Sequence, residues 1–89
     1  MMATVLAPPE RFDHPYDGPV IERVLPLDEA RKVCDYIGIP NADACAGFVT
    51  LQDGSKGCFI AIPTDGFDSV DAYRRHEIAH CNGWPASHE

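Results

Sequence analysis

The chain has 89 residues, of which 45% are hydrophobic and 24% are charged, and this composition is typical of one small folded domain. Seven Lys and Arg residues against fourteen Asp and Glu residues give a net charge of -7, which would repel nucleic-acid phosphates or an anionic membrane surface. We therefore expect neither a nucleic-acid partner nor a membrane partner.

The N-terminal segment lacks the features of an export signal. No basic residue precedes the short apolar run from Ala3 to Ala7. In addition, no apolar run in the chain reaches the roughly 20 residues that cross a bilayer. We therefore expect a cytoplasmic protein.

The chain contains four cysteines, Cys34, Cys45, Cys58 and Cys81. An even number permits two disulfides in three pairings, but the expected cytoplasmic location favours reduced thiols. Cys34 and Cys58 lie in apolar segments and are expected to be small buried hydrophobic residues, while a Cys45–Cys58 disulfide remains an alternative. Because so small a core usually needs a disulfide or a metal ion to stabilise it, metal ligands are expected as well.

Residues 1–19 contain four of the eight prolines and show neither a helical nor an alternating period, so they predict an extended N-terminal arm. Residues 20–89 are then expected to form a single metal-binding domain. This domain begins with a strand over residues 20–25, which has a proline at each end. Such flanking prolines are typical of a strand at the edge of a sheet.

A helix is predicted next, over residues 27–38. Asp28 is a candidate N-cap, and Gly38, with a proline two residues later, ends the helical pattern. The helix should pack on the rest of the domain, because its apolar residues follow a helical spacing on one face: Ala30, Val33, Cys34 and Ile37.

Two apolar runs, at residues 48–51 and 58–62, surround a loop that contains Asp-Gly and predict a β-hairpin. A second helix follows, which Asp68 or Ser69 can cap and which Gly83 ends. The order strand, helix, strand, strand, helix predicts an α+β fold. We expect a small, mostly antiparallel sheet of about three strands, with a backing helix and a helix that bears the active site.

The second helix contains the sequence His76-Glu77-Ile78-Ala79-His80. Two histidines at positions i and i+4 project from one helix face, so both imidazoles can bind one tetrahedral zinc ion. Glu77 is rotated by about 100° from His76, which places its carboxylate beside the metal, where it can exchange a proton with a zinc-bound water. The motif therefore predicts a zinc site with His76 and His80 as ligands and Glu77 as the general base.

This HExxH helix resembles that of the zincins, a superfamily of zinc metallopeptidases. The sequence as far as Gly83 is similar to the metzincin pattern HExxHxxGxxH, in which the glycine turns the chain so that a third histidine reaches the zinc. The third metzincin ligand would fall at Ala86, whereas this chain has His88, two residues later. The chain also resembles small uncharacterised phage and mobile-element proteins with a HExxH helix. The resemblance implies a minimal zincin-like domain over residues 20–88.

His88 is the expected third ligand. The gluzincin alternative requires a glutamate from a further downstream helix, and only Glu89 follows His88. A turn two residues longer than the metzincin turn can still return His88 to the metal, although Pro85 limits the paths that the chain can take. The predicted metal ligands are therefore His76, His80 and His88.

Four further residues near the motif have both a functional and a packing interpretation. Cys81 should point toward the sheet and belong to the core. Trp84 more often closes a small core than binds a ligand. Tyr73 shares the face of His76 and either orients a substrate or packs beside the site. His14 is expected to be an exposed arm residue, with a role as a metal ligand or in covering the cleft as the alternative.

These patterns favour a zinc-dependent metallopeptidase whose substrate is a peptide or protein. Because zincins bind substrate along an edge strand, the resemblance also implies strand addition to the hairpin of residues 46–62. The alternative function is a non-enzymatic zinc-binding module of a phage or mobile element that acts through protein–protein interaction. Glu77 favours the enzyme, since a closed structural zinc site has no use for an unliganded glutamate beside its first histidine. The oligomeric state stays open.

Overall fold

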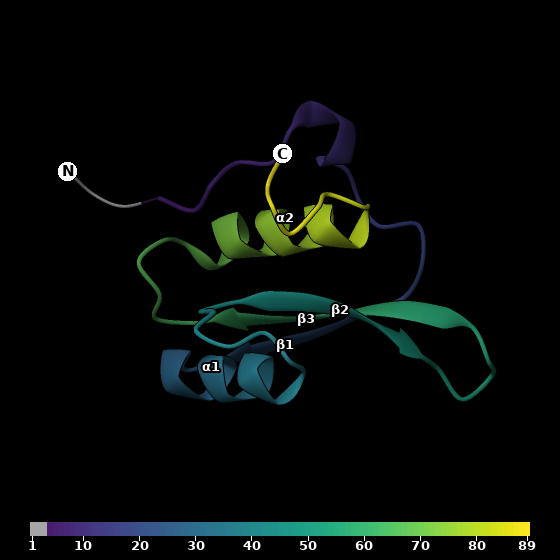
Figure 1. Ribbon diagram of the computed structural model, residues 1–89, viewed down its shortest axis with the longest axis horizontal. Helices are drawn as coiled ribbons and strands as arrows, with labels where there is room; N and C mark the ends of the chain where they lie inside the picture. Colours follow the sequence, from purple (N-terminus) through teal and green to yellow (C-terminus); the bar gives the residue numbers. More distant parts are fainter. Residues whose placement is uncertain (1–3) are drawn as a thin grey trace.

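The computed structural model describes residues 4–89, so the first three residues of the predicted arm lie outside the described residues. A three-stranded sheet lies between two helices (Figure 1). The elements are β1 (Val20–Leu25), α1 (Leu27–Tyr36), β2 (Cys45–Thr50), β3 (Lys56–Pro63) and α2 (Val70–Cys81). The predicted α+β fold with three strands, a backing helix and a motif-bearing helix is confirmed. Within the described residues, no helix is long and apolar enough to span a membrane.

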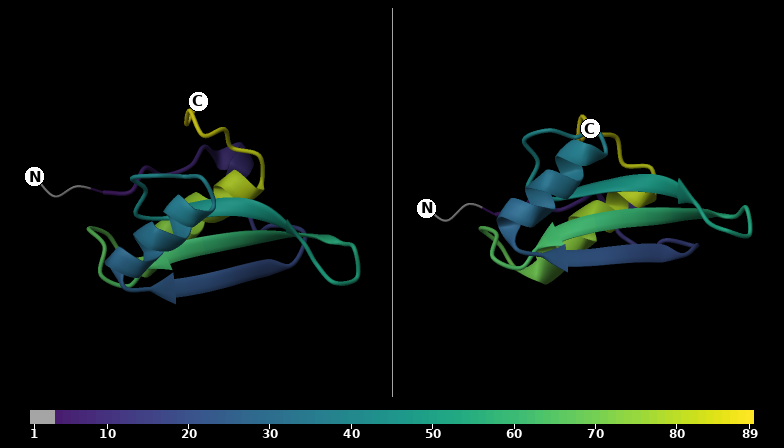
Figure 2. Two further views of the ribbon diagram at one scale, coloured as in Figure 1. Left: turned by 60° about the horizontal axis from the view of Figure 1, so that its bottom comes forward. Right: turned by 90° about the horizontal axis from the view of Figure 1, so that it is seen from below.

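The strand order in the sheet is β1-β3-β2, with β3 at the centre (Figure 2). β1 therefore lies at an edge, as its flanking prolines predicted. β2 and β3 form the predicted antiparallel hairpin, whereas β1 pairs with β3 in parallel, so the sheet is mixed. The parallel pairing is possible because α1 and β2 separate the two strands in the chain, and parallel neighbours need such a long crossover connection.

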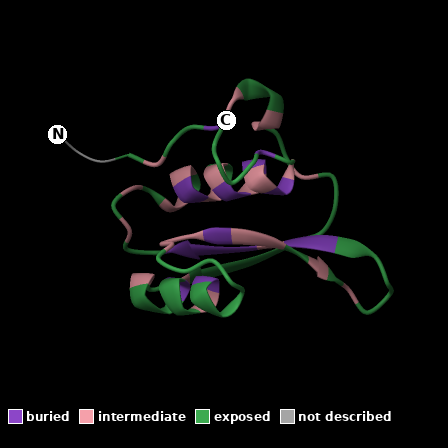
Figure 3. Cartoon of the chain, viewed as in Figure 1, coloured by how far each residue is buried: buried purple, intermediate pink, exposed green. Residues whose placement is uncertain are grey.

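The core lies on both faces of the central strand β3 (Figure 3). Ala61 packs on the α1 side with Cys34 and Cys45, while Ile60 packs on the α2 side with Cys58 and Cys81. Neighbouring residues of β3 thus face opposite helices, which follows from the two-residue period of a strand. A strand covered on both faces is apolar at nearly every position, and β3 is such a strand.

All four cysteines form disulfides, one on each face of the sheet. Cys34 of α1 is bonded to Cys45 of β2, and Cys58 of β3 is bonded to Cys81 of α2, with Cα–Cα separations of 5.7 and 6.0 Å. The prediction of reduced thiols is therefore wrong. The Cys45–Cys58 alternative is also wrong, because Cys45 faces α1 and Cys58 faces α2, so the sheet itself separates their side chains.

Removal of the Cys58–Cys81 disulfide should destabilise the fold. A disulfide that closes a loop of about this length typically contributes about 2–4 kcal/mol, chiefly by restricting the unfolded chain. We expect the double variant Cys58→Ala/Cys81→Ala to lose a free energy of unfolding in that range, measured as a lower urea midpoint. Cys34→Ala/Cys45→Ala is the matched control, since its 11-residue separation is shorter than 23 and should cost slightly less. An unchanged midpoint in both variants would contradict a stabilising role.

The two helices begin differently. Ser69 caps α2, as predicted: its hydroxyl oxygen accepts a hydrogen bond of 3.1 Å from the backbone N–H of Ala72. Asp28 does not cap α1, so that prediction is wrong. Instead the carboxylate of Asp65, in the loop after β3, accepts a hydrogen bond of 2.7 Å from the N–H of Leu27. The sequence could not reveal this cap, because the donor and acceptor are 38 residues apart.

The described part of the arm follows the outer side of α2, so α2 lies between the arm and the sheet (Figure 1). One short 3-10 turn, η1 (Glu10–Phe12), interrupts the otherwise irregular path. The arm then passes the end of α2 and leads into β1. This path brings residues far from the motif in sequence close to the helix that contains it.

Candidate metal centre

The helix α2 places His76 and His80 one turn apart on the same face. Their Nε2 atoms lie 3.2 Å from each other. The side of α2 that packs on the sheet carries Ile78 and Cys81, which contact Cys58 and Ile60 of β3. The helix is thereby fixed with its two histidines directed away from the core, as the i, i+4 spacing predicted.

The chain after α2 turns back and brings His88 to the two helical histidines. Gly83 has φ +102°, a conformation that favours glycine, and the N–H of His88 donates a hydrogen bond of 2.8 Å to the carbonyl of Pro85. This extra turn accommodates the two residues by which the chain exceeds the metzincin spacing. The Nε2 atom of His88 lies 3.2 Å from those of both His76 and His80.

The backbone of His88 is itself unusual. Its φ of 63° lies in the left-handed region, which is unfavourable by roughly 1–2 kcal/mol for a residue other than glycine. Non-glycine residues in this region cluster at functional sites, where surrounding contacts hold them. Asn41, which lies outside the histidine cluster, has the same conformation with φ 62°, so this backbone geometry alone assigns no role to His88.

The geometry of the three nitrogens fits a tetrahedral zinc ion. Bonds of about 2.0–2.1 Å at tetrahedral angles place neighbouring ligand nitrogens about 3.3–3.4 Å apart, close to the 3.2 Å separations observed. Three histidine nitrogens within bonding distance of one point leave the fourth position of a tetrahedral zinc to a water or a substrate atom. A zinc ion held by these three nitrogens would therefore form an open site.

The hydrogen bonds of the ring Nδ1 atoms support the same conclusion. Nδ1 of His76 lies 2.8 Å from the carbonyl oxygen of Leu6, and Nδ1 of His80 lies 2.8 Å from that of Trp84. A carbonyl oxygen only accepts hydrogen bonds, so each Nδ1 carries the proton and each neutral ring directs an Nε2 lone pair at the cluster. Two such lone pairs 3.2 Å apart cannot satisfy each other, whereas a cation between them satisfies both.

Burial favours the neutral, metal-binding form of these rings. Loss of water around His76 and His80 lowers the pKa of each imidazole below its usual value, and the nearby His88 lowers both further. Metal binding requires neutral histidine, so a lowered pKa reduces competition from protons near neutral pH.

Trp84 forms a surface against which all three histidines pack. Its ring is stacked on His80 with an angle of 13° between the planes, and it lies edge-on to His76 and His88, all with centroid distances of 4.8 Å. The indole is 3% exposed, so its expected packing role is observed. The sequence alone did not predict that Trp84 would position the histidines. Its one local signal is that Trp84 directly follows Gly83, which ends the helix.

Glu77 lies beside the histidine cluster and is 5% exposed. One of its carboxylate oxygens is 4.0 Å from Nε2 of His76, too far for a hydrogen bond but close enough to exchange a proton with a water bound at the cluster. Burial alone raises the pKa of Glu77 to about 8. A divalent cation at the three nitrogens would favour the ionised carboxylate and oppose this effect of burial.

The raised pKa of Glu77 predicts how stability depends on pH in the metal-free protein. Because the folded-state pKa of about 8 exceeds the ordinary value of 4.5, the stability contributed by the neutral carboxyl is present below pH 4.5 and is lost up to about pH 8. The variant Glu77→Gln should not lose this stability, because glutamine does not ionise in this pH range. We therefore expect its free energy of unfolding to rise relative to wild type by about a few kcal/mol between pH 5 and 8.

Urea unfolding of the two metal-free proteins at several pH values measures this difference. His76 and His80 have the opposite effect, because their lowered pKa values make the free energy of unfolding rise with pH up to about 6.5. This contribution is the same in wild type and Glu77→Gln, so it cancels when the two proteins are compared. A difference that stays constant with pH would mean that Glu77 ionises in the folded protein as it does in water.

The three histidines and Glu77 line an open cleft of about 350 Å³ between α2, the start of β2 and the loop before it. Its other walls are mainly apolar and include Ile39, Ala46 and Trp84. A second cleft of about 320 Å³ shares His76 and Glu77 with the first. The two clefts therefore meet at the candidate centre, which is accessible from both.

The remaining candidate residues lie outside the cluster. His14 is exposed, and its Nδ1 lies 3.0 Å from the carbonyl of Pro15 rather than near the other histidines. Tyr73 is buried against Gly66 and also lines the second cleft together with His76 and Glu77, so the structure leaves both its packing and its functional interpretation open. Cys81 faces the sheet within its disulfide and is no candidate ligand.

The structure thus brings His76, His80, His88 and Glu77 close to one another. Sequence reasoning missed Leu6 and the positioning effect of Trp84. Comparisons of the chain with protein-family models, with curated proteins and with solved structures found no match.

Proposed function

We propose that this protein is a zinc-dependent metallopeptidase in which His76, His80 and His88 hold the zinc ion. The observation that carries the proposal is the triangle of Nε2 atoms, each 3.2 Å from the other two, with the carboxylate of Glu77 beside it in an open cleft. The resemblance of the motif to the zincin helix supports the same activity.

Residues of the chain would transfer the proton and hold the zinc ligands in position. A zinc ion held by the three histidines would supply Lewis-acid chemistry, since it would lower the pKa of a bound water to about 7 and polarise a carbonyl group. Glu77 accepts the proton of the attacking water and later returns it to the leaving amine. Trp84 and the two carbonyl oxygens hold the imidazoles in place, so that the site is organised before a substrate enters.

The substrate is proposed to be an extended peptide or protein segment. β2 is an edge strand, and its residues Cys45 and Ala46 line the cleft that contains the three histidines. A peptide added along this edge would form main-chain hydrogen bonds with β2 and pass the metal site, as the zincin resemblance implies. No nucleic-acid or membrane partner is proposed, because the chain carries a net charge of -7.

The alternative proposal is a non-enzymatic zinc-binding module that acts through protein–protein interaction. A structural zinc site has four protein ligands, whereas the only metal-binding group found among residues 4–89 consists of three histidines. The disulfides also withdraw all four cysteines from the set of possible ligands. Both observations favour the enzyme.

The sequence predicts a cytoplasmic protein, and nothing in the structure tests this prediction directly. The two disulfides favour an oxidising compartment instead, because cytosolic reductants keep most thiols reduced.

Metal analysis and a peptide-library assay test the proposed function together. Protein purified without added metal should contain about one equivalent of zinc, and it should hydrolyse peptides in a reaction that a chelator stops and added zinc restores. A protein that binds zinc but cleaves no peptide would support the non-enzymatic module. A protein that binds no divalent metal would contradict both proposals.

A further inference from the structure

We propose that the N-terminal arm is a working part of the metal centre, in which the backbone carbonyl of Leu6 positions the imidazole of His76. This inference rests on the proposed metal site. The Leu6 oxygen lies 2.8 Å from Nδ1 of His76, although the two residues are 70 positions apart. Leu6 is therefore a positioning residue, which fixes the ring through its other nitrogen and leaves Nε2 free to bind the metal.

The segment around Leu6 is held at the beginning of α2. The N–H of Val5 donates a hydrogen bond of 2.8 Å to the carboxylate of Asp68, in the loop just before the helix. That carboxylate also accepts a hydrogen bond from Ser69, the N-cap of α2. Two residues after Leu6, Pro8 is buried. The carbonyl of Leu6 thus lies between two fixed points.

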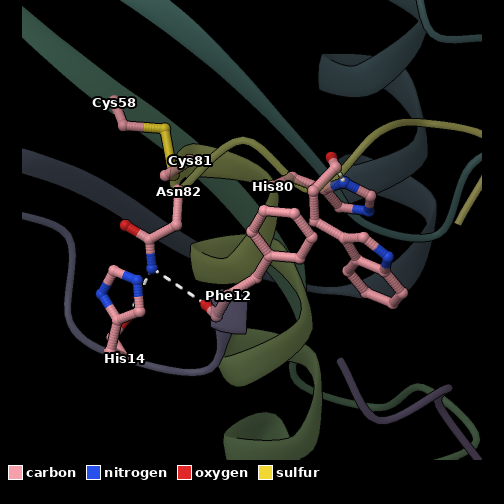
Figure 4. Close-up of a disulfide and its surroundings, with 7 residues drawn as sticks. Phe12, His14, Cys58, His80, Cys81 and Asn82 are labelled. Atoms are coloured by element: carbon pink, nitrogen blue, oxygen red, sulfur yellow. Dashed lines mark hydrogen bonds between the residues drawn. A yellow bond between two sulfur atoms is a disulfide. The ribbon is translucent and has the colours of Figure 1, made fainter. Parts of the chain in front are cut away.

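The arm is held again at the end of α2. The side-chain amide of Asn82, directly after the helix, donates hydrogen bonds to the carbonyls of Phe12 and His14, at 3.0 and 2.5 Å (Figure 4). Asn82 follows Cys81, whose disulfide ties this end of α2 to β3. Asp13 also forms an ion pair with Arg75. The arm is therefore anchored at both ends of the helix that contains the motif.

The arm supplies a partner that nothing local provides. His80 obtains its carbonyl partner from Trp84, four residues later, in the turn that follows the helix. His76 lies within the helix, where neighbouring backbone carbonyls are engaged in helical hydrogen bonds, and its partner comes from the arm. Val5 and Leu6 also line the second cleft together with His76 and Glu77, so the same segment shapes the approach to the site.

The full-length variants Val5→Pro and Val5→Ala test the proposal. Proline removes the N–H that bonds to Asp68, whereas alanine keeps it and serves as the matched control. Loss of an outer-shell partner typically lowers metal affinity by about 10–100-fold. In competition with a chelator we expect Val5→Pro to bind zinc about tenfold more weakly than wild type, and Val5→Ala to bind it nearly as wild type does. Equal affinity in all three proteins would overturn the proposal.

A second measurement reports on the ring itself and does not depend on metal. In the metal-free wild type, ¹⁵N NMR of the imidazoles should show the proton of His76 on Nδ1, and Val5→Pro should show a mixture of tautomers with His80 unchanged. A purely structural arm would lower the thermal unfolding midpoint without changing the tautomer of His76, and this result would contradict the positioning role.

The variant Asp68→Ala covers the case in which Val5→Pro does not fold. It removes the acceptor of the same bond and should weaken zinc binding about tenfold, and unchanged zinc affinity in Asp68→Ala would overturn the proposal. Where Val5→Pro does fold, the double variant should be little worse than either single one. Additive losses would contradict a shared tether. Failure of the metal-site proposal appears separately, as an absence of zinc binding in wild type.

Discussion

Glu77→Gln is expected to reduce peptide hydrolysis by about 10²–10⁴-fold while the protein still binds one equivalent of zinc. The amide keeps the size of the carboxyl group but cannot accept the proton of the attacking water. Metal content should not change, because Glu77 lies outside the triangle of nitrogens, with its nearer oxygen 4.0 Å from Nε2 of His76. Hydrolysis rates and zinc content, measured on the same samples, test both parts.

The matched control for this variant is Glu29→Gln, which makes the same chemical change at an exposed position in the first turn of α1. It should hydrolyse peptides at the wild-type rate. If Glu77→Gln retained hydrolysis at that rate, Glu77 would not be the general base. If it lost zinc together with activity, Glu77 would contribute to metal binding, and the open three-histidine site would be wrong.

His88→Ala is expected to lower zinc affinity by more than about 100-fold, because it removes one of three direct ligands. Loss of an outer-shell hydrogen-bond partner, by comparison, lowers metal affinity by about 10–100-fold. The side chain of His88 is exposed, so the fold should change little in the absence of metal. Competition with a chelator measures the affinity, and urea unfolding of the metal-free protein checks the fold.

His14→Ala is the control for this second variant, since it removes an exposed histidine that lies outside the cluster. Its zinc affinity should equal that of wild type. Equal affinities for His88→Ala and His14→Ala would show that His88 is not a ligand and that the displaced third position of the motif has no role in metal binding.

The sequence predicted well those features that depend on local spacing. The strand of residues 20–25 and the Ser69 cap of α2 follow from nearby residues, and both are observed as predicted. The meeting of His76 and His80 follows from the helical period. The return of His88 depends on more than local spacing, because it needs the positive φ of Gly83 and a turn of several residues.

Features that depend on distant parts of the chain were not predictable in this way. The cap of α1 comes from Asp65, and the hydrogen-bond partner of His76 comes from Leu6, and neither leaves a signal near the residue that it serves. The disulfides were missed for a different reason. An even number of cysteines does not specify their pairing, which depends on the face of the sheet that each cysteine occupies: Cys34 and Cys45 lie on the α1 side, and Cys58 and Cys81 lie on the α2 side.

We propose above that three histidines hold a zinc ion with one position open to water. X-ray absorption spectroscopy of the zinc-loaded protein tests it most directly, because it reports the number and type of atoms bound to the metal. We expect three imidazole nitrogens and one oxygen at about 2.0–2.1 Å from the zinc, with no sulfur. Four imidazole or sulfur ligands, which describe a closed structural site, or fewer than three imidazoles would contradict it.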